Sequence, residues 1–227
     1  MYIIASMVNY KDVYDENYFN GKNSFFWQGG YGHNWGFAWI YFDNLYRQFI
    51  PYIKQYSQAN VLDVGCAYGL MLKRFPSDFH KYGIDVSQHA IARAKQILPH
   101  SKFAEVNVEN SIPFKNNFFD IVTCNDVIEH LERPDAALIQ IYKVLKPGGI
   151  LYLTTPNFNW LRKVLFAYPD RREHHISLIP HKTLETQLQQ IGFKVKKRWT
   201  FSNIFIYIRY PGTLGIESAF ICTKKKY

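Results

Sequence analysis

The stretch VLDVGCAYGL, residues 61–70, decides the fold of this 227-residue chain. Apolar residues lead into Asp63 and Gly65, and Gly69 precedes the next apolar segment. A glycine at this place lets the backbone turn sharply, and a helix that begins here presents free amide groups to a ligand. The spacing is D-x-G-x-x-x-G rather than G-x-G-x-x-G, with Ala67 where a dinucleotide-binding turn has its middle glycine. By itself the stretch predicts a strand, a tight turn and a helix.

Downstream of Tyr52, short apolar runs alternate with segments of helical periodicity, which is typical of βαβ units on a parallel sheet. We expect strands over residues 60–64, 81–85, 102–106, 119–125, 149–154, 193–201 and 218–223. We expect helices over residues 70–75, 88–98, 135–145 and 183–191, the last with Gly192 as its C-cap. Pro211 and Gly212 predict a turn before the final strand, so the last pair is expected to be antiparallel. The order indicates an α/β fold with a doubly wound, Rossmann-like sheet and a reversed edge strand.

The charge and the cysteines restrict the cellular setting. The net charge is +9, and its basic residues fall mainly at 162–163, 171–172, 194–198 and 224–226. Solvated faces or an anionic small substrate explain this charge as well as nucleic acid does, and we regard nucleic acid as the weaker explanation. The longest apolar run, residues 35–42, is too short to span a bilayer, and residues 1–8 lack the basic flank of a signal peptide. Cys66, Cys124 and Cys222 lie in strand-like segments without metal-ligand spacing, so we expect reduced thiols in a cytoplasmic protein.

Four segments in this order resemble the class I S-adenosylmethionine-dependent methyltransferases: VLDVGCAYGLML at 61–72, GIDVS at 83–87, NSIPFKNNFFDIVTCNDVIEHLERP at 110–134 and VLKPGGILYLTTPN at 144–157. The resemblance covers residues 55–195 and is nearest to the small-molecule group that contains ubiquinone and natural-product O-methyltransferases. It implies a sheet of seven strands with the last strand reversed, and S-adenosylmethionine lying across the strand tips.

The resemblance also implies which residues bind the cofactor. The residues expected along its methionine and sulfonium part are Asp63, Gly65, Cys66, Ala67 and Gly69. Asp85 ends the second strand, where an acidic side chain can bind both ribose hydroxyls, with Val86 against the adenine. Many relatives bind the adenine amino group with an acidic residue after the third strand. Val108 occupies that place here, so Asn107 or Glu109 would have to supply the contact. Asn125 is expected beneath the cofactor.

The segment CNDVIEH at the end of the fourth strand permits three interpretations. Asp126 and Glu129 have the spacing of a capping box, with no part in catalysis. His130 can instead be a general base beside the methyl acceptor. Finally, Asp126, Glu129 and His130 can bind a divalent metal, as in relatives with Glu-x-x-Glu-His here. Asp126 in place of the first glutamate weakens that case, so we name His130 as the catalytic candidate and expect no metal.

Two further regions are expected to contact the substrate. Residues 1–52 hold 17 of the 40 aromatic side chains, and we expect them to form an N-terminal cap or lid on a methyltransferase domain at 53–227. Tyr31 and Trp35 are the candidate contacts there, and a helical cap that merely packs on the sheet is the alternative. After the fifth strand, His174 and His175 follow a pair of arginines and can steer an anionic substrate or accept a proton.

The sequence therefore predicts methyl transfer to a small molecule or short peptide, with oxygen as the favoured acceptor atom, by in-line displacement. A catalytically silent cofactor-binding module and an RNA or protein methyltransferase are the alternatives. The fourth strand is not followed by the Asn/Asp-Pro-Pro-aromatic turn of enzymes that methylate exocyclic base amines, and no cysteine follows a proline. The acceptor molecule and the oligomeric state stay open.

Overall fold

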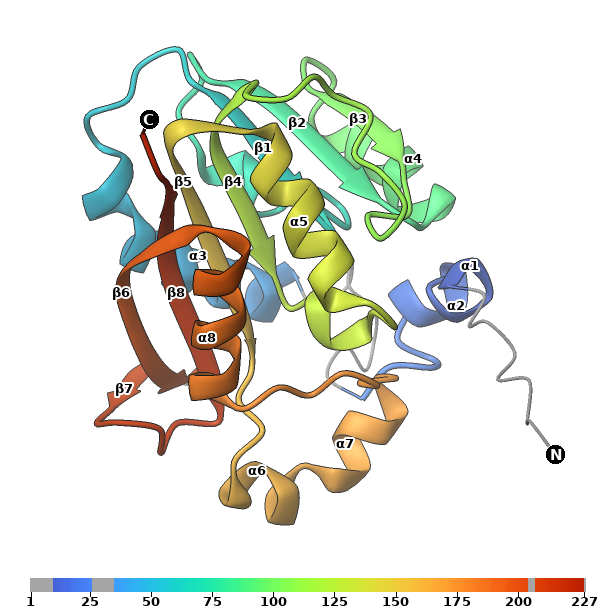
Figure 1. Ribbon diagram of the computed structural model, residues 1–227. Helices are drawn as coiled ribbons and strands as arrows, with labels where there is room; N and C mark the ends of the chain where they lie inside the picture. Colours follow the sequence, from blue (N-terminus) through green and yellow to red (C-terminus); the bar gives the residue numbers. More distant parts are fainter. Residues whose placement is uncertain (1–9, 26–34, 204–206, 227) are drawn as a thin grey trace, which may run out of the picture.

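A mostly parallel sheet of eight strands organises the computed structural model, which describes residues 10–25, 35–203 and 207–226 (Figure 1). The strands are β1 (Asn60–Val64), β2 (His80–Asp85), β3 (Lys102–Glu105), β4 (Phe119–Asn125), β5 (Leu145–Pro156), β6 (Phe193–Ser202), β7 (Ile208–Tyr210) and β8 (Glu217–Lys224). Their order across the sheet is β3-β2-β1-β4-β5-β8-β6-β7. β1 to β5 run parallel to one another, whereas β8 is antiparallel to both β5 and β6. The doubly wound sheet with a reversed last strand is confirmed.

The strand number corrects the expectation of seven. β7 is the additional strand, and its three residues pair with the end of β6 through Thr200↔Tyr210, Phe201↔Arg209 and Ser202↔Ile208. All three β7 residues are exposed, so the strand has no buried face, and a run of three residues is too short for a strand to be recognised from its alternation. The backbone of β6, which would otherwise be an open edge, is what makes this segment a strand.

Helices cover both faces of the sheet, as Figure 1 shows. α5 (Pro134–Val144) and α8 (His181–Ile191) pack on one face, and α3 (Trp35–Ile53) packs on the other. Alternate residues of each strand point to opposite faces. In β1, for example, Leu62 and Val64 join the α5 and α8 layer, whereas Val61 joins the layer of α3. α4 (Gln88–Ile97) lies beside β2 and β3.

The predicted cap segment has two structural roles. Its second part is α3, whose Leu45 and Phe49 are fully buried against the sheet, so this part is a packing layer of the domain. Its first part holds the short helices α1 (Tyr10–Val13) and α2 (Glu16–Phe19), which lie outside the sheet (Figure 1). Two more short helices, α6 (Trp160–Leu165) and α7 (Ala167–Arg172), follow the end of β5.

Most predicted helices are confirmed within one or two residues, with one exception. The helix predicted over 70–75 is only the single 3-10 turn η1 (Leu72–Arg74). Residues 65–69 form a turn with positive φ at Ala67 and at both glycines, so helical structure begins later than predicted. The C-cap at Gly192 is confirmed, with the left-handed φ of +113°.

Two expectations about the whole chain can be compared with the described residues. No helix in these ranges combines the length and the apolarity that crossing a membrane requires. Cys66, Cys124 and Cys222 are all buried, free thiols, as their apolar surroundings in the sequence predicted.

Candidate active site

A cavity of about 250 Å³ lies at the edge of the sheet where the parallel strands end. The strand-tip half of its wall comes from the ends of the strands: Gly65, Ala67, Asp85, Val86, Asn107, Val108 and Asn125. The acidic half comes from the turn after β4, the segment after β5 and the start of β8: Asp126, Glu129, His130, Arg162, His175 and Glu217. α1, α2 and the link between them add Tyr10, Tyr14, Tyr18 and Phe19. The first described part of the N-terminal segment thus lines the same cavity as the strand tips.

The turn after β1 brings the backbone to the cavity surface. Gly65 has a φ of +67°, and a Cβ there would lie 2.3 Å from Cγ2 of Val127, so only glycine fits. The carboxylate of Asp85 accepts hydrogen bonds from the amides of Ala67 and Ser87, both at 2.9 Å. Burial raises the pKa of Asp85 even though these amides favour the charged form. The side chain of Asp85, at the end of β2, therefore holds the turn after β1 by a hydrogen bond to a main-chain amide.

Four of the predicted cofactor residues lie behind the cavity wall and do not line it. Asp63 is buried beneath the turn, where its carboxylate accepts from Oγ1 of Thr123 at 2.6 Å. Burial raises the pKa of Asp63 to about 7. Cys66 belongs to the apolar core on the α3 face, and Gly69 faces Leu98. The structure assigns these residues to the support of the turn.

Glu109 is the fourth of these residues, and its position bears on the adenine contact. Its Oε1 accepts from the amide of Arg133 at 2.6 Å, next to the start of α5, so it faces away from the cavity. Asn107 and Val108 line the cavity instead. At the end of β4, Asn125 also lines it, and Nδ2 of this residue is buried without a hydrogen-bond partner. The strand-tip half therefore offers two amide side chains, one with an unused donor.

The capping-box interpretation of Asp126 and Glu129 is wrong. The turn after β4 forms the 3-10 helix η2 (Ile128–His130), whose N-cap is Val127 and has no side-chain cap hydrogen bond. Asp126 has a positive φ of 53° and accepts from the hydroxyls of Tyr41 and Thr154. Oε2 of Glu129 accepts from Oγ1 of Thr155 at 2.9 Å. Both carboxylates therefore line the cavity and are held by hydroxyl groups rather than by the helix end.

His130 lies between the N-terminal segment and the acidic half. Its Nδ1 is 2.7 Å from the hydroxyl of Tyr14, and the side chain of His130 is 13% exposed. Burial lowers the pKa of His130 well below its usual value, against the opposing effect of hydrogen bonds to the backbone of His174 and Glu173. An imidazole that is neutral at neutral pH has the protonation state that a general base needs.

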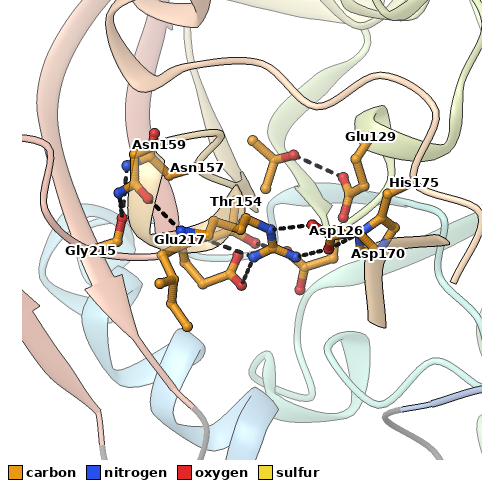
Figure 2. A network of polar contacts seen from close by, with 12 residues as sticks. Asp126, Glu129, Thr154, Asn157, Asn159, Asp170, His175, Gly215 and Glu217 are labelled. Carbon is orange, nitrogen blue, oxygen red and sulfur yellow. Dashed lines mark hydrogen bonds and ion pairs between the residues drawn. The ribbon is translucent and has the colours of Figure 1, made fainter. Parts of the chain in front are cut away.

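One basic residue of the segment after β5 lies in the interior of the molecule. Arg162 is buried, with the guanidinium bonded to Asp170 at 2.6 and 3.2 Å and to Glu217 at 2.9 Å. Oδ1 of Asp170 also lies 2.8 Å from Nδ1 of His175. His174 is exposed and does not line the cavity, whereas His175 does. Figure 2 shows Asp170, His175 and Glu217 gathered in this network.

Glu173 is a functional candidate that no motif or spacing in the sequence indicated. It lines the cavity and is buried, and its carboxylate accepts from the hydroxyls of Tyr18 and Ser24 at 2.8 and 2.7 Å and from the amide of Phe25. It thereby fixes the N-terminal segment to the segment after β5. Two earlier candidates cannot be placed: Tyr31 lies outside the described residues, and so does the side chain of Trp35 at the start of α3.

The comparison with known proteins identifies the family. The family profile described as "Methyltransferase domain" matches residues 39–197, well over half of the chain. The chain belongs to this methyltransferase family. The resemblance to class I methyltransferases is thus confirmed, and the cofactor of these proteins is S-adenosylmethionine.

Curated relatives of this methyltransferase are distant. An uncharacterized methyltransferase of Schizosaccharomyces pombe is 29% identical over 62% of this chain and 53% of its own length. A ubiquinone biosynthesis O-methyltransferase of Hydrogenovibrio crunogenus is 26% identical over 65% of this chain and 68% of its own length. Another, from Idiomarina loihiensis, is 30% identical over 56% of this chain and 54% of its own length. The chain spans about half the length of most of these relatives.

Solved structures share the fold at low identity. The cyclase SpnF matches with a TM-score of 0.66 and 20% identity, covering 82% of each chain. A SAM-dependent methyltransferase from Thermotoga maritima matches with a TM-score of 0.62 and 16% identity, covering 84% of this chain and all of its own. Because one neighbour is a cyclase, the fold alone does not fix the reaction.

The methyltransferase cavity also contains a group of side chains that could hold a metal. Glu129, His130 and His175 each offer a ligand atom, and these atoms all lie within 4.8 Å of one another. Carboxylate oxygens and imidazole nitrogens are ligands that zinc and related divalent ions accept. The sequence suggested Asp126, Glu129 and His130 as possible metal ligands. In the structure Glu129 and His130 do lie together, but the third residue of the group is His175 and not Asp126.

Proposed function

We propose that this chain transfers the methyl group of S-adenosylmethionine to an oxygen atom of a small molecule. The observation that carries the proposal is the continuity of the cavity. Its strand-tip half holds Asp85 and Asn125, where the family binds its cofactor, and the same cavity reaches His130. A bound cofactor and an acceptor would therefore share one space, as an in-line displacement requires.

The chemistry divides between cofactor and protein. The sulfonium supplies the electrophile, so the protein needs to align the acceptor and to remove its proton. His130 is the proposed base, and the low pKa that burial gives this imidazole leaves it free to accept a proton at neutral pH. The hydroxyl of Tyr14, which lies 2.7 Å from Nδ1 of His130, would fix the orientation of the imidazole ring.

Water exclusion is the proposed role of the N-terminal segment. Tyr10, Tyr14 and Tyr18 line the cavity from outside the sheet, and Tyr18 is fixed through Glu173. A closed cavity strengthens electrostatic interactions and keeps the acceptor in register with the methyl group. Several relatives are O-methyltransferases of ubiquinone biosynthesis, which supports oxygen as the acceptor atom.

Two measurements test the proposal. Calorimetry with S-adenosylmethionine or S-adenosylhomocysteine should show micromolar binding, which corresponds to about 8 kcal/mol. A screen of small phenols, other hydroxyl compounds and amines should then show one acceptor that gains the mass of one methyl group. No binding heat at high cofactor concentration would contradict the cofactor site, and methyl transfer to nitrogen alone would contradict the choice of oxygen.

A further inference from the structure

Carboxyl side chains outnumber basic side chains along the described wall of the cavity. Five carboxylates line the whole cavity: Asp85, Asp126, Glu129, Glu173 and Glu217. Among the described lining residues, Arg162 is the sole lysine or arginine. Its charge is shared between Glu217 and a further carboxylate, Asp170. The imidazoles of His130 and His175 are the remaining basic groups, so the described wall of the cavity has five carboxyl groups and three basic groups.

The partners of these carboxylates are mostly hydroxyl groups. Asp126 is bonded by Tyr41 and Thr154, and Glu129 by Thr155. Neither carboxylate is hydrogen-bonded to a lysine or arginine in the described part of the chain. The nearest basic group to Glu129 is Nε2 of His130, at 3.9 Å, which is too long for a hydrogen bond. Figure 2 draws Asp126, Glu129 and Glu217 among the residues of this polar network.

Two carboxylate oxygens in this region have no partner among the described residues. Oε1 of Glu129 and Oε2 of Glu217 are buried and accept no hydrogen bond from residues 10–25, 35–203 or 207–226. The side chain of Glu129 is 1% exposed and lines the cavity, so water outside the molecule does not solvate it. An acceptor atom left unpaired in a buried place costs free energy, and a donor on a ligand would recover it. The acidic half therefore has unused hydrogen-bond acceptors that a positively charged group with N–H donors would fill.

We infer that the methyl acceptor of this chain carries an ammonium group, which binds between Glu129 and Glu217 in the acidic half. The inference rests on the proposed function and adds the charge class of its substrate. An ammonium offers three N–H donors and one positive charge, which suits two unpartnered oxygens and a neighbouring carboxylate, Asp126. The anionic substrate considered from Arg171 and Arg172 does not suit this chamber, because both arginines are exposed and neither lines it.

A metal ion at Glu129, His130 and His175 is the competing occupant. Nδ1 of His130 lies beside the Tyr14 hydroxyl and Nδ1 of His175 beside Asp170, so each ring would present Nε2 to a metal, as metal-bound histidines commonly do. A metal held by these three residues would also leave Oε2 of Glu217 without a partner. An ammonium group would donate to both unpartnered oxygens, Oε1 of Glu129 and Oε2 of Glu217, and we prefer it for this reason.

Binding of three matched phenols tests the inference. Tyramine, tyrosol and para-hydroxyphenylacetate share a ring and differ in carrying a positive charge, no charge and a negative charge. Calorimetry with the full chain, both with and without S-adenosylhomocysteine, should show tyramine binding about 10-fold or more tightly than tyrosol. Para-hydroxyphenylacetate should bind more weakly than tyrosol. The Glu129→Gln and Glu217→Gln variants, which keep the side-chain volume, should each reduce the preference for tyramine and leave S-adenosylhomocysteine affinity unchanged.

The controls separate this inference from the proposed function. Asp78→Asn, an exposed carboxylate outside the cavity, should leave the tyramine preference intact. Equal or weaker binding of tyramine relative to tyrosol, at normal cofactor affinity, would overturn the ammonium site alone. Absence of cofactor binding would instead overturn the proposed function, while the charge preference could still be read from the cofactor-free chain. Tight binding of Mg²⁺ or Zn²⁺ alone, abolished by Glu129→Gln, would assign the chamber to a metal and overturn the inference.

Discussion

The two halves of the cavity are built from different kinds of contact. In the strand-tip half, the carboxylate of Asp85 is held by amides 2 and 18 positions away in the sequence. In the acidic half, the hydroxyl of Tyr14 reaches His130 across 116 positions, and that of Tyr18 reaches Glu173 across 155. One half therefore depends on the backbone of neighbouring turns, and the other on side chains that meet only when the chain is folded.

This difference has a functional consequence. Backbone amides are present whatever the side chain, so a site built from them can bind the same cofactor in many distant relatives. Side-chain networks change with single substitutions, and this is where chains with one fold come to differ in acceptor. We expect substitutions in the acidic half to alter turnover and specificity, and those in the strand-tip half to alter cofactor affinity. The predictions below test that division in order of decreasing effect.

The largest effect is expected at His130. His130→Ala should lower turnover by about 10²–10⁴-fold, the usual loss for a general base, and leave cofactor affinity nearly intact. His174→Ala is the matched control, because His174 is exposed and does not line the cavity. Steady-state kinetics on the identified acceptor, with calorimetry for the cofactor, measures both. If the variant keeps full turnover, His130 is not the general base. If the variant does not fold, His130 has a structural role.

The next effect concerns stability in the acidic half. Arg162→Met would leave the buried carboxylates of Asp170 and Glu217 without their cation, at a cost of about 3–5 kcal/mol in the free energy of unfolding. Denaturant titration by circular dichroism measures it. Arg171→Met is the control, since Arg171 is exposed and a surface substitution should change stability by about 0.5 kcal/mol or less. Equal effects of the two variants would show that the network contributes nothing.

The strand-tip half should show its own pH dependence through Asp63. Burial raises the pKa of this carboxyl to about 7 in the folded chain, whereas the unfolded value is about 3.9. Between these values the folded state binds the additional proton, so this group makes stability fall as the pH rises. The contribution is on the order of 2–4 kcal/mol across the window. Asp63→Asn should remove this contribution and make the profile shallower from acid to neutral pH, measured by denaturant titration at each pH. An unchanged slope in the variant would contradict the raised pKa.

A smaller effect is expected at Asp85. Asp85→Asn should weaken S-adenosylhomocysteine binding by about 1–3 kcal/mol, because a charged acceptor for the ribose hydroxyls is lost. Calorimetry measures the affinity, with Asp78→Asn as the exposed control. Unchanged affinity would mean that Asp85 does not bind the ribose and only accepts hydrogen bonds from the amides of Ala67 and Ser87.

The same contrast explains what the sequence could predict. β1 and β4 were predicted with their observed bounds, because a buried parallel strand ends where the turn glycine or the first polar residues begin. The turn at Gly65 and the place of Asp85 were predicted for the same reason, since both are local. The burial of Arg162 was not predicted, because its partners Asp170 and Glu217 lie 8 and 55 positions away and a basic pair reads as a solvated surface. Glu173 was missed because Tyr18, Ser24 and Phe25, which donate hydrogen bonds to it, come from the N-terminal segment.

The smallest effect is expected from metal removal. Treatment with a chelator followed by gel filtration should leave turnover unchanged, because the sulfonium of the cofactor is already an activated electrophile and the base is an imidazole. The side chains that could bind an ion are partly committed elsewhere: Glu129 to Thr155, His130 to Tyr14 and His175 to Asp170. Metal analysis of the purified chain should accompany the kinetics. Turnover that is lost on chelation and restored by Mg²⁺ would make Glu129, His130 and His175 a metal site, and it would move the acidic half from acceptor binding to metal binding.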